Sequence, residues 1–180
     1  AGFPASSADE FSTVKAIAAE GLKTTVCGLA RSVRSDVDRC IDAGVDMVHV
    51  FIPTSEVQRK HTIRKSHEEV VAITGDIVRY ARDHADKVLF SAMDATRTGI
   101  PELIEVFTAA VDAGATAINV PDTVGVAPPT SMQEMIRALC KQLRLGSHIA
   151  ESYRQIQAAT QEEFLVKVLT EALAAREVER

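Results

Sequence analysis

Residues 118–125, Ile-Asn-Val-Pro-Asp-Thr-Val-Gly, join an apolar, β-branched run to polar side chains that could bind a ligand. The run stops at Pro121, and Asp122 and Thr123 follow at once. This pattern is typical of a buried strand that ends in a polar loop. Parallel α/β proteins place their sites at the carboxyl ends of their strands. We therefore expect a functional site at this loop, with other side chains converging on the same rim.

An internal repeat places two polar side chains at equivalent strand positions. Residues 40–50 match residues 110–120 at an offset of 70 residues, with helix end, glycine and strand in the same register. His49 thereby corresponds to Asn119. Polar residues are unusual in a buried strand. Either the two side chains form hydrogen bonds inside a packed barrel or they reach a ligand, and the pattern leaves both possibilities open.

Other polar residues are weaker candidates. Asp94, Thr96 and Arg97 follow the third predicted strand, where an ion pair that orders the loop and a contact with substrate explain them equally well. Residues 54–65 are predicted to form a polar loop, and its basic part at residues 59–65 could approach an anionic CoA or carboxylate, although a solvated loop is the simpler interpretation. The remaining histidines of this region are predicted to lie at the surface: His61, His67 and His84.

Alternating strands and helices must position these side chains. Strand patterns occur at residues 24–29, 45–53, 87–91 and in the run before Pro121, and residues 1–4 resemble the end of a further strand. Amphipathic helical patterns separate them, with capping signals such as Ser66 followed by Glu69. No hairpin signal intervenes. The pattern predicts an α/β fold, with a parallel sheet of five strand–helix steps and right-handed crossovers.

Composition narrows the class of protein. The 180 residues can form one domain with a core, and 46% hydrophobic with 25% charged residues is ordinary for a globular protein. The net charge of −5 gives no support for nucleic-acid binding, and no apolar run approaches the ~20 residues of a transmembrane helix. We expect a cytoplasmic protein that binds neither nucleic acid nor membrane. Three cysteines without CxxC spacing are predicted to be buried thiols: Cys27, Cys40 and Cys140.

The pattern changes after Leu143. Residues 144–180 contain no strand signal, and they show amphipathic helical stripes that end in a charged tail. We expect two parts, a barrel-like part at residues 1–143 and a C-terminal helical extension at residues 144–180, which would dock on apolar surface that the first part leaves open. The first residues lack an initiator Met and a signal-peptide pattern, which we interpret as a chain entered part-way through.

Five short motifs follow one another in the order and spacing of a known enzyme family. They are Gly-Phe-Pro at residues 2–4, Cys-Gly-Leu-Ala-Arg at 27–31, His-Val-Phe-Ile-Pro-Thr-Ser at 49–55, Phe-Ser-Ala-Met-Asp-Ala-Thr-Arg at 90–97 and Asn-Val-Pro-Asp-Thr-Val-Gly at 119–125. Residues 1–143 resemble the middle of the catalytic barrel of the 2-isopropylmalate synthases. These belong to the metal-dependent Claisen-type synthases and lyases, with homocitrate synthase, citramalate synthase and hydroxymethylglutaryl-CoA lyase. The resemblance implies an incomplete TIM barrel, from about strand 2 to the helix after strand 6.

The resemblance also implies a reaction. In this family a divalent metal, Mg or Mn, polarises a 2-oxo acid, and the enolate of acetyl-CoA attacks it. For the synthase branch, which the form of the last motif favours, the oxo acid is 2-oxoisovalerate and the pathway is leucine biosynthesis. Thr123 corresponds to the threonine that binds the oxo-acid carboxylate. Four further residues correspond to the lining of the oxo-acid pocket: His49, Ser91, Asn119 and Pro121.

The chain departs from the family where the charged chemistry lies. Nothing corresponds to the arginine and aspartate of the family's first strand, and the metal-binding His-x-His is absent, because His148 stands alone in Ser-His-Ile. Met93 replaces a glutamate that relatives usually carry, and Leu89 stands where they often have another. Methionine neither accepts a proton nor binds a hard cation. We therefore predict no retained catalytic residue, no metal ligand and no condensation by this chain alone.

Three hypotheses remain. The chain is part of a 2-isopropylmalate-synthase-like acyltransferase, or it is a non-catalytic partial barrel that self-associates, with residues 145–180 covering an exposed sheet edge. The third is a relative with lyase, homocitrate synthase or citramalate synthase activity. Parallel strands taken from a closed barrel leave open edges and an apolar interior. We therefore expect a homo-oligomer, or an open sheet covered by the C-terminal helices.

Overall fold

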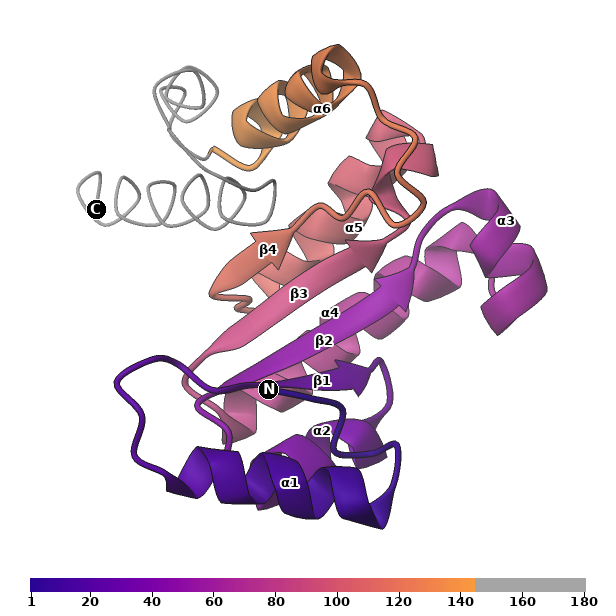
Figure 1. Cartoon of the computed structure of the whole chain (residues 1–180). Helices are drawn as coiled ribbons and strands as arrows, with labels where there is room; N and C mark the ends of the chain where they lie inside the picture. The colour runs from indigo at the N-terminus through magenta and orange to yellow at the C-terminus, as the bar shows by residue number, and fades with distance from the viewer. Residues whose placement is uncertain (145–180) are drawn as a thin grey trace. The chain divides into compact units, whose positions relative to one another are not determined.

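Four parallel strands form the centre of the protein in the computed structural model, which describes residues 1–144 (Figure 1). They lie in the order β1-β2-β3-β4, and each neighbouring pair is parallel. Their bounds are Cys27–Arg31 (β1), Met47–Pro53 (β2), Val88–Met93 (β3) and Ala117–Asn119 (β4). Gly2 forms an isolated parallel bridge with Gly28 at the β1 edge, where the sequence predicted the end of a further strand. The predicted α/β fold, an unclosed part of a parallel barrel, is confirmed.

Helices alternate with these strands. The longer ones are Ala8–Ala19 (α1), Arg34–Asp42 (α2), His67–His84 (α4), Ile100–Asp112 (α5) and Pro129–Gln142 (α6). The short turns are Glu56–Gln58 (α3), a π-helix at Arg59–Ile63 and a 3-10 turn at Ala95–Arg97. The predicted capping box is present, since Ser66 Oγ accepts from the Glu69 N–H at 3.2 Å and the Glu69 carboxylate accepts from the Ser66 N–H at 2.8 Å. Such reciprocal bonds satisfy the free donors of a helix start.

The prediction of a solvated loop at residues 54–65 was wrong. Ser55 caps the turn α3, and at the end of the π-helix the N–H groups of Arg64 and Lys65 both donate to the Arg59 carbonyl, the latter at 3.1 Å. The Arg59 side chain is buried; it donates to the Thr54 carbonyl at 2.9 Å and to Glu102 at 3.1 Å. Glu102 lies on α5, 43 residues along the chain. A local sequence pattern cannot reveal a partner that is 43 residues away along the chain.

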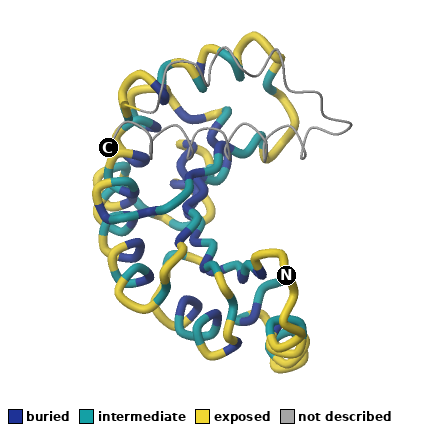
Figure 2. Tube along the Cα trace, turned by 90° about the vertical axis from the view of Figure 1, so that its left-hand side faces the viewer, coloured by how far each residue is buried: buried dark blue, intermediate teal, exposed yellow. Residues whose placement is uncertain are grey.

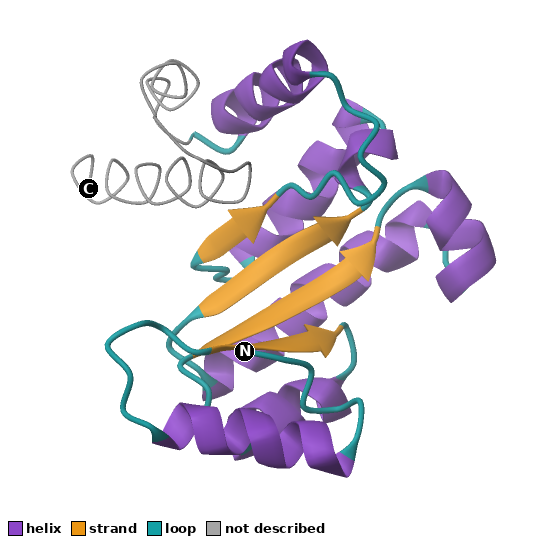
Figure 3. Ribbon diagram, in the orientation of Figure 1, coloured by secondary structure: helices purple, strands orange, loops and turns teal. Residues whose placement is uncertain are grey.

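The two faces of the sheet have different surroundings (Figure 2). Alternate residues point toward α2, α4 and α5 and are buried: Ala30, Val48, Val50, Val88, Phe90 and Ile118. Figure 3 shows these helices on one side of the sheet. The residues between them point away from the helices, and most are only half-buried. We call these two sides the covered face and the open face.

The chain divides into two compact units, residues 1–123 and a second unit that begins at Val124. The first contains the whole sheet, and the described part of the second contains α6. The expected C-terminal extension at residues 144–180 lies outside the described residues from 145 onward, as does His148. The boundary at residue 143 therefore stays a prediction. No described helix is long and apolar enough to cross a membrane.

Candidate functional site

Three of the predicted site residues form one row across the open face. His49 comes from β2, Ser91 from β3 and Asn119 from β4. Ser91 and Asn119 lie opposite each other in the register of β3 and β4. His49 Nε2 lies 2.6 Å from Ser91 Oγ, and Asn119 Nδ2 donates to the same oxygen at 2.9 Å. The repeat left open whether His49 and Asn119 form hydrogen bonds or reach a ligand. The structure shows the hydrogen bonds, made through Ser91, on the face that points away from α2, α4 and α5.

The row is electrically neutral near neutral pH. Burial lowers the pKa of His49 to about 4 because it disfavours the charged ring. A neutral imidazole has one donor and one acceptor nitrogen. Since Ser91 Oγ already accepts from Asn119, its proton suits an acceptor at His49 Nε2, which leaves the ring proton on Nδ1. The row can therefore hold polar atoms of a ligand without supplying charge.

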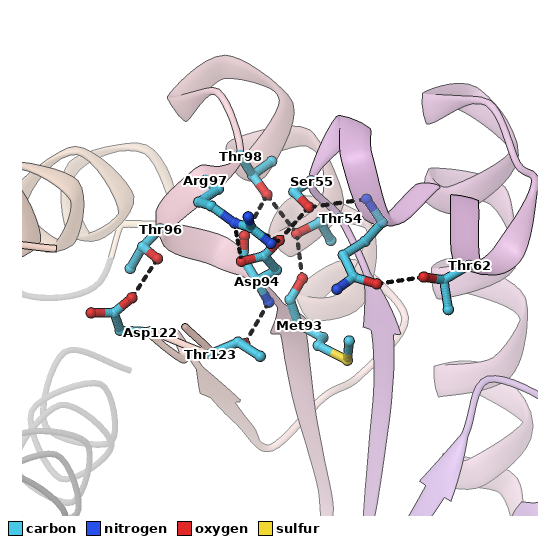
Figure 4. A network of polar contacts seen from close by, with 11 residues as sticks. Thr54, Ser55, Thr62, Met93, Asp94, Thr96, Arg97, Thr98, Asp122 and Thr123 are labelled. Atoms are coloured by element: carbon cyan, nitrogen blue, oxygen red, sulfur yellow. Dashed lines mark hydrogen bonds and ion pairs between the residues drawn. The ribbon is translucent and has the colours of Figure 1, made fainter. Parts of the chain in front are cut away.

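A second group of contacts, the rim network, surrounds Asp94 at the carboxyl end of β3 (Figure 4). We define it as Ser55, Asp94, Arg97, Thr98 and Thr123. The fully buried Asp94 carboxylate accepts from Ser55 Oγ, from Arg97 Nη2 at 2.6 Å and from Arg97 Nε at 2.8 Å. Its backbone N–H donates to Thr123 Oγ1 at 2.8 Å. One residue thus connects the loops that follow β2, β3 and β4.

Asp94 has the left-handed backbone conformation, with φ of 65°. Aspartate adopts it more readily than most residues, although it remains uncommon without glycine. The Thr98 hydroxyl and the Arg97 N–H both donate to the Asp94 carbonyl, at 3.0 and 3.2 Å. Burial of the carboxyl raises its pKa, but the hydrogen bonds from Arg97 and Ser55 outweigh burial and hold the pKa of Asp94 below its ordinary value. The carboxylate is therefore ionised and fully engaged.

The predicted site residues thus fall into two hydrogen-bonded groups. His49, Ser91 and Asn119 lie in the row, and the exposed Thr123 belongs to the rim network. Pro121 is half-buried in the segment that joins Asn119 to Thr123. Within the described residues the structure shows no hydrogen bond between the two groups, so a ligand would have to span them.

Sequence reasoning foresaw part of the rim network. The structure shows Asp94 and Arg97 as an ion pair, which was one of two equal interpretations, while Thr96 donates to Asp122 Oδ1 at 2.7 Å. Ser55 was missed as a partner of Asp94. The signal was present, because Ser55 lies two residues after a predicted strand and ends one of the quoted motifs. Only the strand register shows that it meets a residue 39 positions away.

The open face does not fit a divalent cation. Its strand residues include no carboxylate, and Met93 and Leu89 contribute a thioether and an alkyl group. The Met93 carbonyl is used as well, since it accepts from the Thr54 N–H and hydroxyl at 3.0 and 3.1 Å. Among residues 1–144 no three His, Cys, Asp or Glu side chains are grouped to hold a metal ion. A hard cation requires several oxygen ligands, which this face does not offer.

Other reactive side chains lie outside this arrangement. His61 and His84 are exposed as predicted, but His67 is half-buried and its Nε2 lies 2.7 Å from Glu105. Its partner Glu105 lies on α5, 38 residues away, and is itself exposed, so the contact is at the protein surface. The three cysteines are free, and burial raises the pKa of Cys40 to about 12. Its thiol therefore stays protonated and unreactive.

Together the fold, the row and the rim network define a class of protein: a parallel α/β fold of the barrel type, with polar side chains on the open face and at the carboxyl ends of its strands. Residues 1–154 match the HMGL-like family, and the chain belongs to it. This finding confirms the family that the five motifs indicated.

Relatives named 2-isopropylmalate synthase match most of the chain. The protein from Methanocaldococcus jannaschii is 50% identical over 145 residues, which cover 81% of this chain and 28% of the relative. The protein from Streptococcus gallolyticus is 45% identical over 153 residues, which cover 83% of this chain and 29% of the relative. The chain thus spans less than a third of the length of these relatives.

Solved structures of hydroxymethylglutaryl-CoA lyases share the fold. The lyase from Pseudomonas aeruginosa has a TM-score of 0.63 at 18% identity, covering 79% of this chain and 50% of the lyase. The lyase from Bacillus subtilis has a TM-score of 0.61 at 22% identity, covering 74% of this chain and 46% of the lyase. At such identities the likeness supports the architecture and not a shared reaction.

Proposed function

We propose that this chain is part of the acyltransferase barrel of a 2-isopropylmalate-synthase-type enzyme and forms the wall that holds the 2-oxo acid. The observation that carries the proposal is the row of His49, Ser91 and Asn119 on the open face. The identity of about half to proteins named 2-isopropylmalate synthase supports the same reaction, a condensation of acetyl-CoA with 2-oxoisovalerate. Thr123, above the row at the strand ends, would bind the carboxylate of the oxo acid.

The physical properties of the wall suit such a ligand. A carboxylate only accepts hydrogen bonds, so it needs donors such as the Thr123 hydroxyl and loop N–H groups. The neutral row suits an oxo or hydroxyl oxygen, which carries no full charge. Half-buried apolar neighbours on the same face, Phe51 and Leu89, suit an aliphatic side chain. Each part of a branched 2-oxo acid therefore finds a matching group.

The chain supplies recognition without the charged part of the chemistry. Because the open face lacks a carboxylate and Met93 cannot accept a proton, we propose that this chain alone does not perform the condensation. The metal site would come from parts of the barrel outside it, and the base is the group that Met93 does not supply in this chain.

A chimaera tests this proposal. The matched segment of the Methanocaldococcus jannaschii relative is replaced by this chain in two versions, one with Met93 and one with Met93→Glu. We expect both to bind 2-oxoisovalerate by calorimetry. The glutamate version should release CoA from acetyl-CoA about 100-fold faster or more, since a general base contributes on that order. Thr123→Val in the glutamate version should weaken binding of the oxo acid.

The control is the folded state of each chimaera, monitored by circular dichroism and sedimentation. A glutamate chimaera that folds like the natural relative but neither binds 2-oxoisovalerate nor releases CoA would contradict the proposal. It would favour the second candidate, a non-catalytic partial barrel that self-associates. That candidate has one observation in its favour: within residues 1–144, β4 is an edge strand of the sheet, beside a half-buried open face. Homo-oligomer formation stays a prediction.

A further inference from the structure

Asp94 is the residue through which the three rim loops are joined. We propose that Asp94 is a positioning residue for Thr123: its buried carboxylate holds the rim loops so that its backbone N–H directs the Thr123 hydroxyl as a hydrogen-bond donor toward an anionic ligand. For the identity of that ligand, a 2-oxo acid carboxylate, the inference rests on the proposed function.

The hydrogen bonds at Thr123 have a defined direction. A hydroxyl has one proton to donate and two lone pairs to accept with. Thr123 Oγ1 accepts from the Asp94 N–H at 2.8 Å, so this bond uses a lone pair and leaves the hydroxyl proton for donation. The residue is exposed, so that proton can reach a bound molecule. The arrangement prefers a partner that only accepts, which is the property of a carboxylate.

The side-chain contacts of Asp94 keep its backbone N–H in place. A non-glycine residue with φ of 65° persists when its surroundings hold it there. At Asp94 the surroundings are Ser55 from the loop after β2 and Arg97 from its own loop, both bonded to the carboxylate. Charge-assisted bonds of this kind are roughly twice as strong as neutral ones. The side chain therefore fixes the backbone conformation on which the bond to Thr123 depends.

The Asp94 carboxylate itself does not contact a ligand. Asp94 has no exposed surface, and both carboxylate oxygens accept from Arg97 while Oδ2 also accepts from Ser55. A carboxylate would also repel an anionic ligand. Asp94 therefore acts through Thr123 and is not a catalytic residue.

The test combines Asp94→Asn, Thr123→Val and the double variant in the full 180-residue chain. Asparagine keeps the shape and accepts a left-handed backbone, but it loses the charge that holds Arg97. We expect NMR three-bond couplings to show one side-chain rotamer for Thr123 in the natural chain and averaged rotamers in Asp94→Asn. We expect the dissociation constant for 2-oxoisovalerate to rise about 10-fold in Asp94→Asn relative to the natural chain. In the presence of Thr123→Val, adding Asp94→Asn should raise the dissociation constant by less than about 2-fold.

The matched control is Asp36→Asn. Asp36 is also buried, and it accepts from the backbone N–H and the guanidinium of Arg31, so its loss perturbs a similar ion pair without contacting Thr123. It should lower stability and leave the Thr123 rotamer unchanged. If Asp94→Asn fails to fold, Ser55→Ala removes one donor to the carboxylate, keeps Arg97, and should loosen Thr123 partially.

Two results would overturn the inference: a single Thr123 rotamer in folded Asp94→Asn, or an equal loss of affinity with and without the Thr123 hydroxyl. The rotamer measurement needs no ligand. If the natural chain does not bind 2-oxoisovalerate although Asp94→Asn releases Thr123, the proposed function fails and the positioning role is supported.

Discussion

The covered and the open faces of the sheet differ although their residues alternate along the same strands. On β3, Phe90 is fully buried and its ring meets Phe107 of α5 edge to face, with centroids 5.9 Å apart. Its neighbour Ser91 points the other way and bonds with His49 and Asn119. On β2, fully buried Val50 likewise follows the half-buried His49. Adjacent residues of one strand therefore have different roles: one packs against the helices, and the next forms polar contacts on the open face.

The difference shows where a strand can accept polar side chains at little cost. The covered face excludes water, so an unpaired polar group there would carry its full desolvation cost. The open face is partly solvated and its polar groups bond with one another, so three of them are tolerated. The full charge of Asp94 lies at the rim, where a guanidinium and a hydroxyl satisfy it. Substitutions on the two faces should therefore have effects of very different size.

Phe90→Ala should have the largest effect of the substitutions that compare the faces. Removing a fully buried aromatic ring leaves a cavity and typically costs about 3–5 kcal/mol of unfolding free energy. We expect about 4 kcal/mol here, because the edge-to-face contact with Phe107 is also lost. Urea unfolding followed by far-UV circular dichroism measures it, since the chain has no tryptophan.

Leu89→Ala is the matched control on the open face. Leu89 is the preceding residue of β3 and is half-buried, so we expect a loss of about 1 kcal/mol. An equal loss for the two variants would break the comparison. It would mean that the open face is packed in solution as tightly as the covered one.

The sequence indicated the elements better than the contacts between them. Helix starts could be predicted because a cap joins residues three positions apart, as Ser66 and Glu69 do. The repeat also placed His49 and Asn119 correctly on equivalent strand positions. Their common partner Ser91 came only from resemblance, because the bond depends on the alignment of separate strands.

The rim network was the part least accessible to sequence reasoning. Asp94 was identified with two possible roles, and its actual partners include Ser55 and Thr123, which are 39 and 29 residues away. The helical turn at residues 56–63 was missed for the same reason, since a distant ion pair buries Arg59. Hydrophobic periodicity and caps describe contacts within a turn or two of the chain. Long-range polar contacts follow only from the folded arrangement.

A pH titration should show an intermediate effect from His49. The pKa of its folded form is about 4, against 6.5 in the unfolded chain. Between these values the unfolded state binds a proton that the folded state does not, so stability falls as the pH decreases. Lowering the pH from about 7.5 to about 5 should cost about 2 kcal/mol from this group, since one pKa unit corresponds to about 1.4 kcal/mol.

His49→Gln provides the reference for that titration. The variant retains all other ionisable groups, so the difference between the two pH dependences isolates His49. NMR titration of the ring in the natural chain measures the folded pKa directly. A ring that titrates near pH 6.5, or identical pH dependences for the two proteins, would show that the open face is better hydrated than its burial indicates.

Asn119→Ala should have the smallest effect, and it addresses the question that the repeat left open. The substitution removes one neutral donor to Ser91 from a half-buried position, where water can replace it. A neutral hydrogen bond contributes about 1 kcal/mol, so we expect a loss of at most that size in urea unfolding. A loss near that of Phe90→Ala would show that the row is part of the stabilising core. A small loss of stability, combined with weaker binding of 2-oxoisovalerate, would show that the Asn119 side chain serves ligand binding. The fold would then be stable without its amide.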